Sequence, residues 1–333
     1  MRKKQVAICD TNAEFAEKLQ EYWKETGGPS CRTEFYTDPE RFMEYVLVQR
    51  PYACVISEDL ARDEDYGVVA KYCEKVVVLC EDKDGLPPNG IYRYQNGDVL
   101  ARQLNEMTGI GNSHTYGCVD RSTKLVGVYT PIGRCLQTSF TLVLGQMLAS
   151  KYKVLYLNFE SFSGFSQMMQ RNFNSDMADL LYFLKNLSQD FTHQFENAKQ
   201  NINGLDFVPP AFSYIDISQV LPVEWERFFD ELGKQGEYDF ILLDLTDYVQ
   251  GLYQILRSCS HVYTITRNDG MALAKIAHYE DVLKELSYED IIEKTKKCSF
   301  PIYRQLPANM EELIHSELAD YVRKILREDF DFR

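Results

Sequence analysis

The sequence lacks the features of small secreted, fibrous and disordered proteins. Glycine (18) and proline (11) are too scarce for a collagen-like or low-complexity chain, and 45% of the 333 residues are apolar. The length exceeds the roughly 100 to 200 residues of a typical domain. Length and composition together predict two globular domains, each with a full hydrophobic core.

Paired cysteines and clustered histidines are also missing. The nine cysteines are odd in number, form no CxxC motif and lie mostly in apolar runs such as VAIC and VVVLC. The five histidines show no metal-ligand spacing. This pattern is typical of reduced core cysteines and not of a disulfide framework or a zinc site. We therefore expect a cytoplasmic protein with no zinc, flavin or NAD cofactor.

Basic charge is in deficit, and long apolar runs are missing. Lys and Arg number 36 against 50 Asp and Glu, which gives a net charge of −14. Such a surface repels phosphate backbones and anionic bilayers. No apolar stretch reaches the about 18 to 20 residues that a membrane span needs. We expect neither nucleic-acid binding nor direct membrane insertion.

The first hundred residues alternate short apolar runs with amphipathic ones. Apolar spacing and turn residues predict strands at 5–9, 32–37, 52–57, 75–80 and 90–94, and helices at 13–24, 38–48, 59–73 and 97–107. Strands that alternate with helices form a parallel sheet covered on both faces. The sequence therefore predicts an α/β domain.

With Asp10 at the end of its first strand, this order resembles the receiver domain of two-component response regulators. A working receiver phosphorylates an aspartate, where this chain has Ser57. Cys80 stands at the position of the strand-four hydroxyl, and Gln95 at that of the strand-five lysine. The resemblance implies that residues 1–107 form an atypical, silent pseudo-receiver that binds other proteins.

Two alternatives stay open for the receiver remnant, Asp10 and Ser57. The domain could keep a residual ligand or carry a modification on Ser57. Asp10 could equally be an ordinary polar residue that faces water at the end of a strand. Residues 108–122 lack periodicity and contain three glycines, which indicates a linker before a second domain at 123–333.

The stretch 125–149 is the most informative part of the second domain. A β-rich run passes through a Pro/Gly turn into a helix that we expect to begin near Thr138. This arrangement points backbone N–H groups and the positive helix end at a bound anion, as in phosphate-binding loops. The GxxxxGK[ST] pattern fails, however, because Gln137 occupies the lysine position and Leu136 the preceding glycine.

Two further apolar runs end in polar residues. The run 153–165 contains Asn158 and Glu160, and the run 237–247 contains Asp244. Carboxylates at the carboxyl ends of strands supply Mg²⁺ and water contacts in doubly wound sheets. Further strand candidates lie at 204–211, 261–267 and 299–307.

Residues 123 to about 328 resemble the deviant-Walker ATPases of the MinD and ParA superfamily. The family loop KGGxGKTT falls on residues 132–139, so both lysines and two of the three glycines are missing. The predicted fold is therefore a flavodoxin-like receiver domain followed by a doubly wound, mostly parallel P-loop NTPase-like domain. The resemblance implies nucleotide contacts from the loop residues Thr130, Pro131, Ile132, Gly133, Arg134, Cys135, Leu136, Gln137, Thr138 and Ser139.

The same resemblance implies ATP and Mg²⁺ as cofactors. Thr138 and Asp244 would hold the metal, and Glu160 would be the catalytic residue. The missing lysine removes an ionic hydrogen bond of roughly 1.5 to 3 kcal/mol, or about one to two decades of affinity. Gln137 can donate one neutral hydrogen bond instead, and Arg134 can replace some charge. Weak nucleotide binding and no binding both stay open, whereas efficient hydrolysis is not expected.

With a degenerate receiver in front, the whole chain resembles the TadZ and CpaE family, which positions Flp/Tad-type pilus machinery. This implies a homodimeric localisation or scaffold protein that contacts pilus or secretion components. Partners would recruit it to the cell pole or the inner face of the membrane. The alternative is a slow ParA/MinD-type switch ATPase. A DNA-partition or transcription regulator comes third, because the chain is acidic and lacks a helix-turn-helix pattern.

Overall fold

The computed structural model describes residues 5–26, 31–62, 64–108, 123–185, 191–235, 237–301, 303 and 305–330. The chain divides into two compact units, Met1–Thr115 and Tyr116–Arg333. The division falls inside the expected linker, of which residues 109–122 lie outside the described part of the chain.

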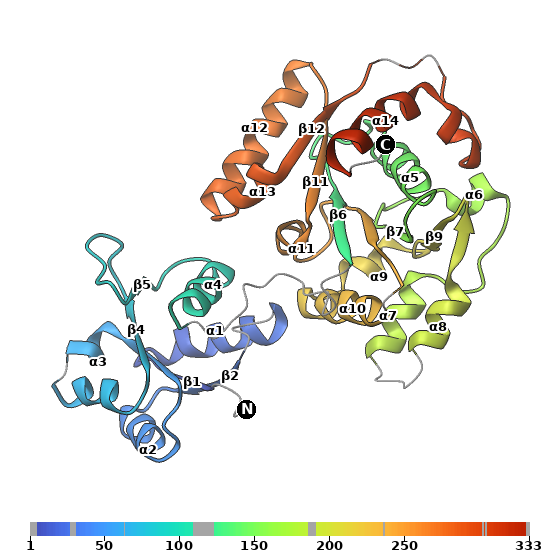
Figure 1. Ribbon diagram of the computed structural model, residues 1–333. Coiled ribbons are helices and arrows are strands. Elements are labelled where there is room, and N and C mark those ends of the chain that lie inside the picture. The colour runs from blue at the N-terminus through green and yellow to red at the C-terminus, as the bar shows by residue number, and fades with distance from the viewer. Residues whose placement is uncertain are drawn as a thin grey trace. The chain divides into compact units, whose positions relative to one another are not determined.

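Within those described residues, the first unit contains a five-stranded parallel sheet of strand order β2-β1-β3-β4-β5 (Figure 1). The flavodoxin-like group of doubly wound folds has this order. Its strands are β1 (Gln5–Cys9), β2 (Arg32–Tyr36), β3 (Ala53–Ser57), β4 (Lys75–Cys80) and β5 (Gly90–Tyr92). Its helices are α1 (Ala13–Thr26), α2 (Pro39–Gln49), α3 (Glu58–Arg62), η1 (Glu64–Lys71) and α4 (Gly97–Thr108).

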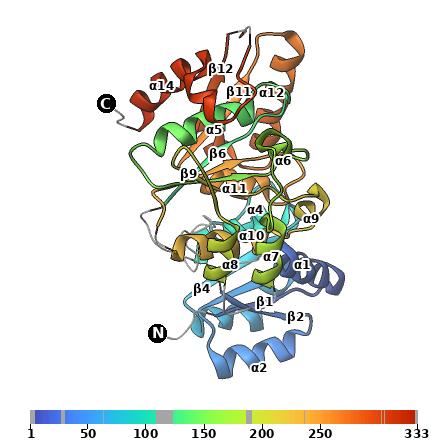
Figure 2. The same cartoon turned by 90° about the vertical axis from the view of Figure 1, so that its right-hand side faces the viewer.

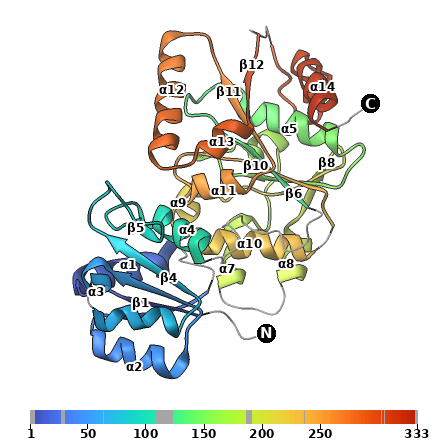
Figure 3. The ribbon, with the colours of Figure 1, turned by 60° about the vertical axis from the view of Figure 1, so that its left-hand side comes forward.

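Helices cover both faces of this sheet (Figure 3). Trp23 of α1 and Leu104 of α4 pack with strand residues on one face, and Phe42 of α2 packs on the other. Successive residues of a strand point to opposite faces, so the apolar runs of β1 and β3 supply both cores.

The second unit contains a seven-stranded sheet of order β12-β11-β6-β10-β7-β9-β8, counted over its described residues. Every strand pair is parallel except β8–β9. This confirms the predicted α/β class with a doubly wound, mostly parallel second sheet. The strands are β6 (Lys124–Val128), β7 (Val154–Asn158), β8 (Gln200–Ile202), β9 (Leu205–Val208), β10 (Phe240–Asp244), β11 (His261–Thr266) and β12 (Thr295–Ser299).

Two layers of helices cover this sheet (Figure 2). One layer packs around Phe140 and Leu144 and consists of α5 (Gln137–Leu148), α6 (Phe165–Met169), η2 (Glu311–His315) and α14 (Glu317–Asp329). The other packs around Trp225 and Phe228 and consists of α7 (Met177–Lys185), α8 (Phe191–Ala198), α10 (Pro222–Lys234), α11 (Leu252–Ser258), α12 (Gly270–Glu285) and α13 (Glu289–Lys294). The short α9 (Tyr214–Ser218) precedes α10. No helix in the described ranges is both long and apolar enough to span a bilayer.

The prediction of a strand at 299–307 is wrong. The strand is β12, Thr295–Ser299, and the described residues of 300–307 form no strand. β12 lies at the edge of the sheet and buries only Cys298 fully, so its TKKCS sequence carries a weak apolar signal. Pro301 and Pro307 oppose strand pairing in the stretch that we had expected to be the strand.

Candidate functional site

Three neighbouring strands of the second sheet end at the same level. Asp244, the last residue of β10, is paired in register with Val128 at the end of β6 and with Asn158 at the end of β7. The strands are parallel, so their carboxyl ends form one edge, and α5 begins at this edge after the loop that follows β6. The fold therefore brings together Gln137, Asn158 and Asp244, which are far apart in the sequence.

The loop before α5 keeps an unusual backbone. Gly133, Arg134 and Leu136 all have positive φ angles, of 64°, 47° and 68°. Arg134 and Leu136 stand where the family motif has glycine, and non-glycine residues adopt this left-handed conformation at a cost of about 1 to 3 kcal/mol each. The loop thus has a glycine-type backbone at two positions that hold other residues.

The side chain of Gln137 is buried and turned toward the sheet. Its amide nitrogen Nε2 donates to Oδ1 of Asp244 at 2.6 Å and to the carbonyl oxygen of Leu245 at 2.9 Å. Both neighbours accept hydrogen bonds only, which fixes the orientation of the amide. Asp244 and Leu245 thus use both N–H groups of Gln137, so the expected hydrogen bond from Gln137 to a phosphate would require breaking one of these contacts.

Asp244 is fully buried within a network of neutral donors. Its Oδ2 atom accepts from the Tyr156 hydroxyl at 2.9 Å and from Asn158 Nδ2 at 3.0 Å. Asn158 Nδ2 also donates to the Tyr156 hydroxyl at 2.7 Å. Burial raises the pKa of Asp244, and hydrogen bonds from Gln137, Thr138, Tyr156 and Asn158 oppose that rise. No lysine or arginine of the described chain forms an ion pair with it.

Glu160 lies beside this network but is only partly buried. Its backbone N–H donates to Oδ1 of Asn158 at 3.0 Å. Burial, reinforced by the negative charges of Asp244 and Asp247, raises the pKa of Glu160 to about 7. Asp247 accepts a hydrogen bond from the Tyr129 hydroxyl at 2.5 Å. The edge of the sheet is thus acidic, and its other carboxylates raise the pKa of Glu160.

The remaining loop residues surround this edge without contributing a cation to it. Thr130 donates its hydroxyl to the carbonyl oxygen of Ile265 at 2.6 Å. Cys135 is buried, which raises its thiol pKa to about 11. The other loop residues divide into half-buried and exposed ones, namely Pro131, Ile132, Thr138 and Ser139 in the first group and Gly133, Arg134 and Leu136 in the second.

These residues do not fit the phosphate chain of a hydrolysable Mg·ATP. The side chain at the lysine position already donates both amide hydrogens within the protein, and the carboxylate that would orient the metal is fully buried. A triphosphate here would meet Asp244 and Glu160 without a lysine to offset them.

A pocket of about 460 Å³ opens beside the loop, toward β11 and β12. Arg134 and Arg267 line it together with the apolar and aromatic side chains of Leu136, Phe300, Pro301, Tyr303 and Leu306. Arg267 is exposed and lies 3.4 Å from Asp269. The two arginines therefore face this side pocket, and neither forms an ion pair with Asp244.

In the first unit, Asp10 does not face water as one alternative supposed. It is fully buried and forms an ion pair of 2.5 Å with Arg93, which also lies 3.0 Å from Glu81. The Arg93 guanidinium carbon is 4.5 Å from the centre of the Phe15 ring. Burial raises the pKa of Asp10, which the N–H of Asn12 and the charge of Arg93 oppose. An internal guanidinium thus neutralises the acid at this edge.

Ser57 and Gln95 are two further residues singled out by the receiver resemblance. Ser57 is fully buried, and its hydroxyl has no hydrogen-bond partner among the residues that the structure describes. Gln95 lies beyond the end of β5 and donates to Gln103 at 2.7 Å, so it does not take the place of the strand-five lysine. Arg93 provides the cation instead. The sequence feature that could have identified Arg93 is a charged residue among the aromatic residues of IYRY, within the strand expected at 90–94.

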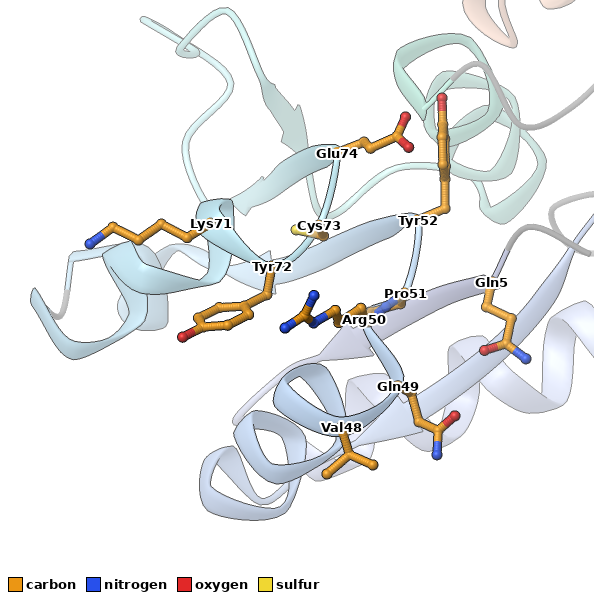
Figure 4. Close-up of a pocket in the computed structure, with 10 residues that line it drawn as sticks. All are labelled: Gln5, Val48, Gln49, Arg50, Pro51, Tyr52, Lys71, Tyr72, Cys73 and Glu74. Carbon is orange, nitrogen blue, oxygen red and sulfur yellow. The ribbon is translucent and has the colours of Figure 1, made fainter. Parts of the chain in front are cut away.

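A second pocket, of about 770 Å³, lies in the first unit at the edge of the sheet where its strands begin (Figure 4). Its lining comes from residues that precede strands or begin them, such as Gln5, Tyr52 and Glu74. Arg50 extends toward the Tyr72 ring, with 6.0 Å between its guanidinium carbon and the ring centre. None of the predicted site residues lines this pocket.

Comparison with known proteins yields structural likeness only. No protein-family model and no curated protein matches the chain. The solved structures similar to it include a plasmid partition protein from Borrelia burgdorferi, with 14% identity and a TM-score of 0.44. That match covers 63% of this chain and 99% of the other.

Two further similar structures are a ParA family ATPase and a MinD cell division protein. The ParA family ATPase from Chlorobium tepidum TLS has 15% identity and a TM-score of 0.44, over 62% of this chain and 92% of its own. The MinD protein from Aquifex aeolicus has 16% identity and a TM-score of 0.41, over 63% and 90%. At such values these likenesses carry no inference about activity.

Proposed function

We propose that the chain is a catalytically silent ParA/MinD-type protein that acts by binding other proteins. The specific role proposed is that of a TadZ/CpaE-like localisation or scaffold protein for a pilus or secretion assembly. One observation carries the proposal: the amide of Gln137 is hydrogen-bonded to Asp244 and Leu245 at the position where an ATPase needs a phosphate-binding lysine.

Phosphoryl transfer depends on cations that stabilise the charge growing in the transition state. To contact a phosphate, Gln137 would have to leave Asp244, and breaking a hydrogen bond to a buried charged group costs about 1.5 to 3 kcal/mol. Even then it would offer a neutral donor in place of an ammonium group. Hydrolysis is therefore disfavoured for two reasons: Gln137 carries no positive charge, and its amide is already hydrogen-bonded to Asp244.

The first unit supports the same role. The Asp10–Arg93 ion pair occupies the carboxyl edge of its sheet, and Ser57 replaces the aspartate that a receiver phosphorylates. We propose that residues 1–107 act as a pseudo-receiver that contacts proteins without a phosphorylation cycle. Protein binding is then the function that both units share.

ATP hydrolysis by the full chain tests the catalytic part of the proposal. Phosphate release with Mg²⁺ and saturating ATP should equal that of an Asp244→Asn variant, which serves as the background. Calorimetric titration with Mg·ATP separates binding from turnover. Turnover above background in the native chain, abolished by Asp244→Asn, would contradict a silent site.

The slow switch ATPase remains a second candidate, because Glu160 has a pKa near 7 and can accept a proton at neutral pH. The two candidates differ in their response to Glu160→Gln. A switch ATPase loses turnover in this variant, whereas a silent protein has no turnover to lose. The same phosphate-release assay thus distinguishes them.

We further propose a homodimer that does not depend on nucleotide. The resemblance implies that a lysine at the Ile132 position reaches the partner's nucleotide, and an isoleucine cannot make this ionic contact. Light scattering should give the same molar mass with and without Mg·ATP. A monomer that dimerises only with ATP would contradict this part.

The pilus role needs a test in cells of the source organism. A fluorescent fusion of the full chain should localise at one pole, and its deletion should disperse the pilus or secretion components. An Asp244→Asn fusion should localise as the native chain does, because localisation would require no hydrolysis. A diffuse native fusion, or unaffected assembly after deletion, would refute the role.

A further inference from the structure

Four exposed apolar side chains gather near the carboxyl edge of the second sheet. They form an aromatic patch, defined here as Phe162, Phe212, Tyr214 and Ile215. Phe162 is 90% exposed and Phe212 is 98% exposed, values that are unusual for phenylalanine. Tyr214 and Ile215 are exposed by 39% and 50%. Contiguous apolar patches of this kind mark interaction sites on soluble proteins.

Two rings of the patch are in contact and are supported by the core. The rings of Phe162 and Tyr214 meet edge to face with 6.2 Å between their centres, and Tyr214 lies 5.4 Å from the Tyr248 ring. Tyr248 donates its hydroxyl to the carbonyl oxygen of Phe159, which is itself buried against Trp225. The exposed rings of Phe162 and Tyr214 are therefore supported by Tyr248, which is hydrogen-bonded to the core.

Phe212 is held at its backbone. Its N–H donates to Oδ2 of Asp176 at 2.9 Å, and Ser213 caps α9 by accepting from the N–H of Ile215. The side chain of Phe212 is left in water although the backbone beside it is ordered by hydrogen bonds. Because this backbone is already ordered, a partner that covers the ring would restrict mainly the two side-chain torsions of Phe212.

The segments that carry or adjoin the patch have charge of one sign only. Residues 159–165, 174–179, 211–218 and 245–250 include no lysine, arginine or histidine. Their five acids are Glu160, Asp176, Asp179, Asp216 and Asp247. Apolar rings with an acidic border are complementary to an apolar segment that carries lysine or arginine, which also gains cation–π contacts with the rings.

We infer that the aromatic patch binds a basic amphipathic segment of a partner protein. This inference rests on the proposed protein-binding function and names the chemistry of the partner. A second copy of the chain is disfavoured, because a twofold contact would bring the same acidic border onto itself. Nucleic acids and anionic membranes are repelled for the same reason.

The test uses the full chain and an 18-residue fluorescein-labelled peptide. The peptide forms an amphipathic helix with lysines on one face and leucines and one tryptophan on the other. The matched control peptide has glutamate in place of every lysine. The variant Phe162→Ser/Phe212→Ser removes the patch, and Met271→Ser/Leu273→Ser removes two other exposed apolar side chains, on α12. All of these side chains are exposed, so both variants should fold.

In fluorescence anisotropy, the native chain should bind the lysine peptide and not the glutamate peptide. The patch variant should bind at least tenfold more weakly, whereas the α12 variant should match the native chain. Asp216→Lys should weaken binding, and added salt should do the same. These results together would support the inference.

Three outcomes would overturn it. The first is equal loss of binding in the patch and α12 variants, and the second is equal affinity for the two peptides. The third is a fall in molar mass of the patch variant in light scattering, which would assign the patch to a second copy. ATP turnover in the native chain would refute the silent site while leaving the peptide result standing, so the two failures are distinguishable.

Discussion

Gln137 donates its amide to Asp244 across 2.6 Å at the carboxyl edge of the second sheet. This hydrogen bond joins the first residue of α5 to the last residue of β10. It places a neutral donor against a fully buried carboxylate and ties the start of α5 to the core. The contact thus contributes to the stability of the fold.

Replacing Gln137 with leucine should destabilise the protein. The change removes one donor from a buried carboxylate and one from the Leu245 carbonyl oxygen, at a cost of about 2 to 4 kcal/mol in the free energy of unfolding. Urea denaturation measures it. The double variant Gln137→Leu/Asp244→Leu should recover part of the loss, since it leaves no charge unsatisfied. Unchanged stability in the single variant would disprove the role given to this contact.

Replacing Leu136 with glycine should stabilise the protein. Leu136 has a φ of 68°, which glycine adopts without strain, and its side chain is partly exposed. We expect a gain of about 1 kcal/mol in the free energy of unfolding, reduced by the greater flexibility of glycine in the unfolded chain. Leu136→Ala is the control, because it shortens the side chain and keeps the strained backbone. Equal stability of the two variants would contradict this explanation.

Replacing Arg93 with methionine should strongly destabilise the first unit. The change leaves Asp10 as a buried charge without its counter-ion, which costs about 3 to 5 kcal/mol. Arg32→Met is the matched control, because Arg32 pairs with Glu34 at the surface and should cost less than about 1 kcal/mol. Denaturation of the full chain measures both. Equal losses of stability in the two variants would show that the Asp10–Arg93 ion pair does not stabilise the first unit.

Replacing Glu160 with glutamine should stabilise the protein increasingly as the pH rises. The pKa of Glu160 is about 7 in the folded protein and 4.5 in a model peptide, so the folded state binds this proton more tightly. Its contribution is therefore most favourable at low pH and is lost between about pH 4.5 and 7. The gain in Glu160→Gln should reach the order of 1 kcal/mol at pH 8, after allowance for partial exposure. Thermal unfolding at pH 5 and pH 8 measures it.

The exposed glutamate variant Glu17→Gln is the control for this pH series. Its effect on the melting temperature should be the same at both pH values. A pH-independent effect of Glu160→Gln would show that burial does not raise the pKa of Glu160.

Acetyl phosphate with Mg²⁺ should leave the first unit unmodified. Ser57 stands where a receiver has its aspartate, and its hydroxyl is fully buried. Intact mass spectrometry of the full chain should show no added phosphate, with a working receiver protein as the positive control. A phosphorylated species that persists in Ser57→Ala would place the modification elsewhere, and one that disappears would overturn the silent assignment.

Sequence patterns were sufficient for most elements of both sheets. Long apolar runs such as those of β3 and β10 predict buried strands, because parallel strands covered on both faces must be apolar throughout. β12 escaped prediction because an edge strand needs only one buried residue, here Cys298. The helix expected near Thr138 begins one residue earlier, at Gln137.

At the candidate site, the residue types were predictable but their partners were not. Asn158 and Asp244 followed from their positions at strand ends. Tyr156 was overlooked, although it lies two residues before Asn158 and therefore points to the same face of β7. Arg93 was overlooked because nothing in the local sequence links it to Asp10, 83 residues away.

By itself the sequence determined which groups are missing, namely both lysines of the phosphate loop and the aspartate that a receiver phosphorylates. Those absences are properties of single positions and need no structure. Only the tertiary structure decided how the chain compensates for them. Hydrogen bonds and ion pairs join residues that strand order brings together. Gln137 therefore donates to the buried Asp244 in the second unit, and Arg93 neutralises Asp10 in the first.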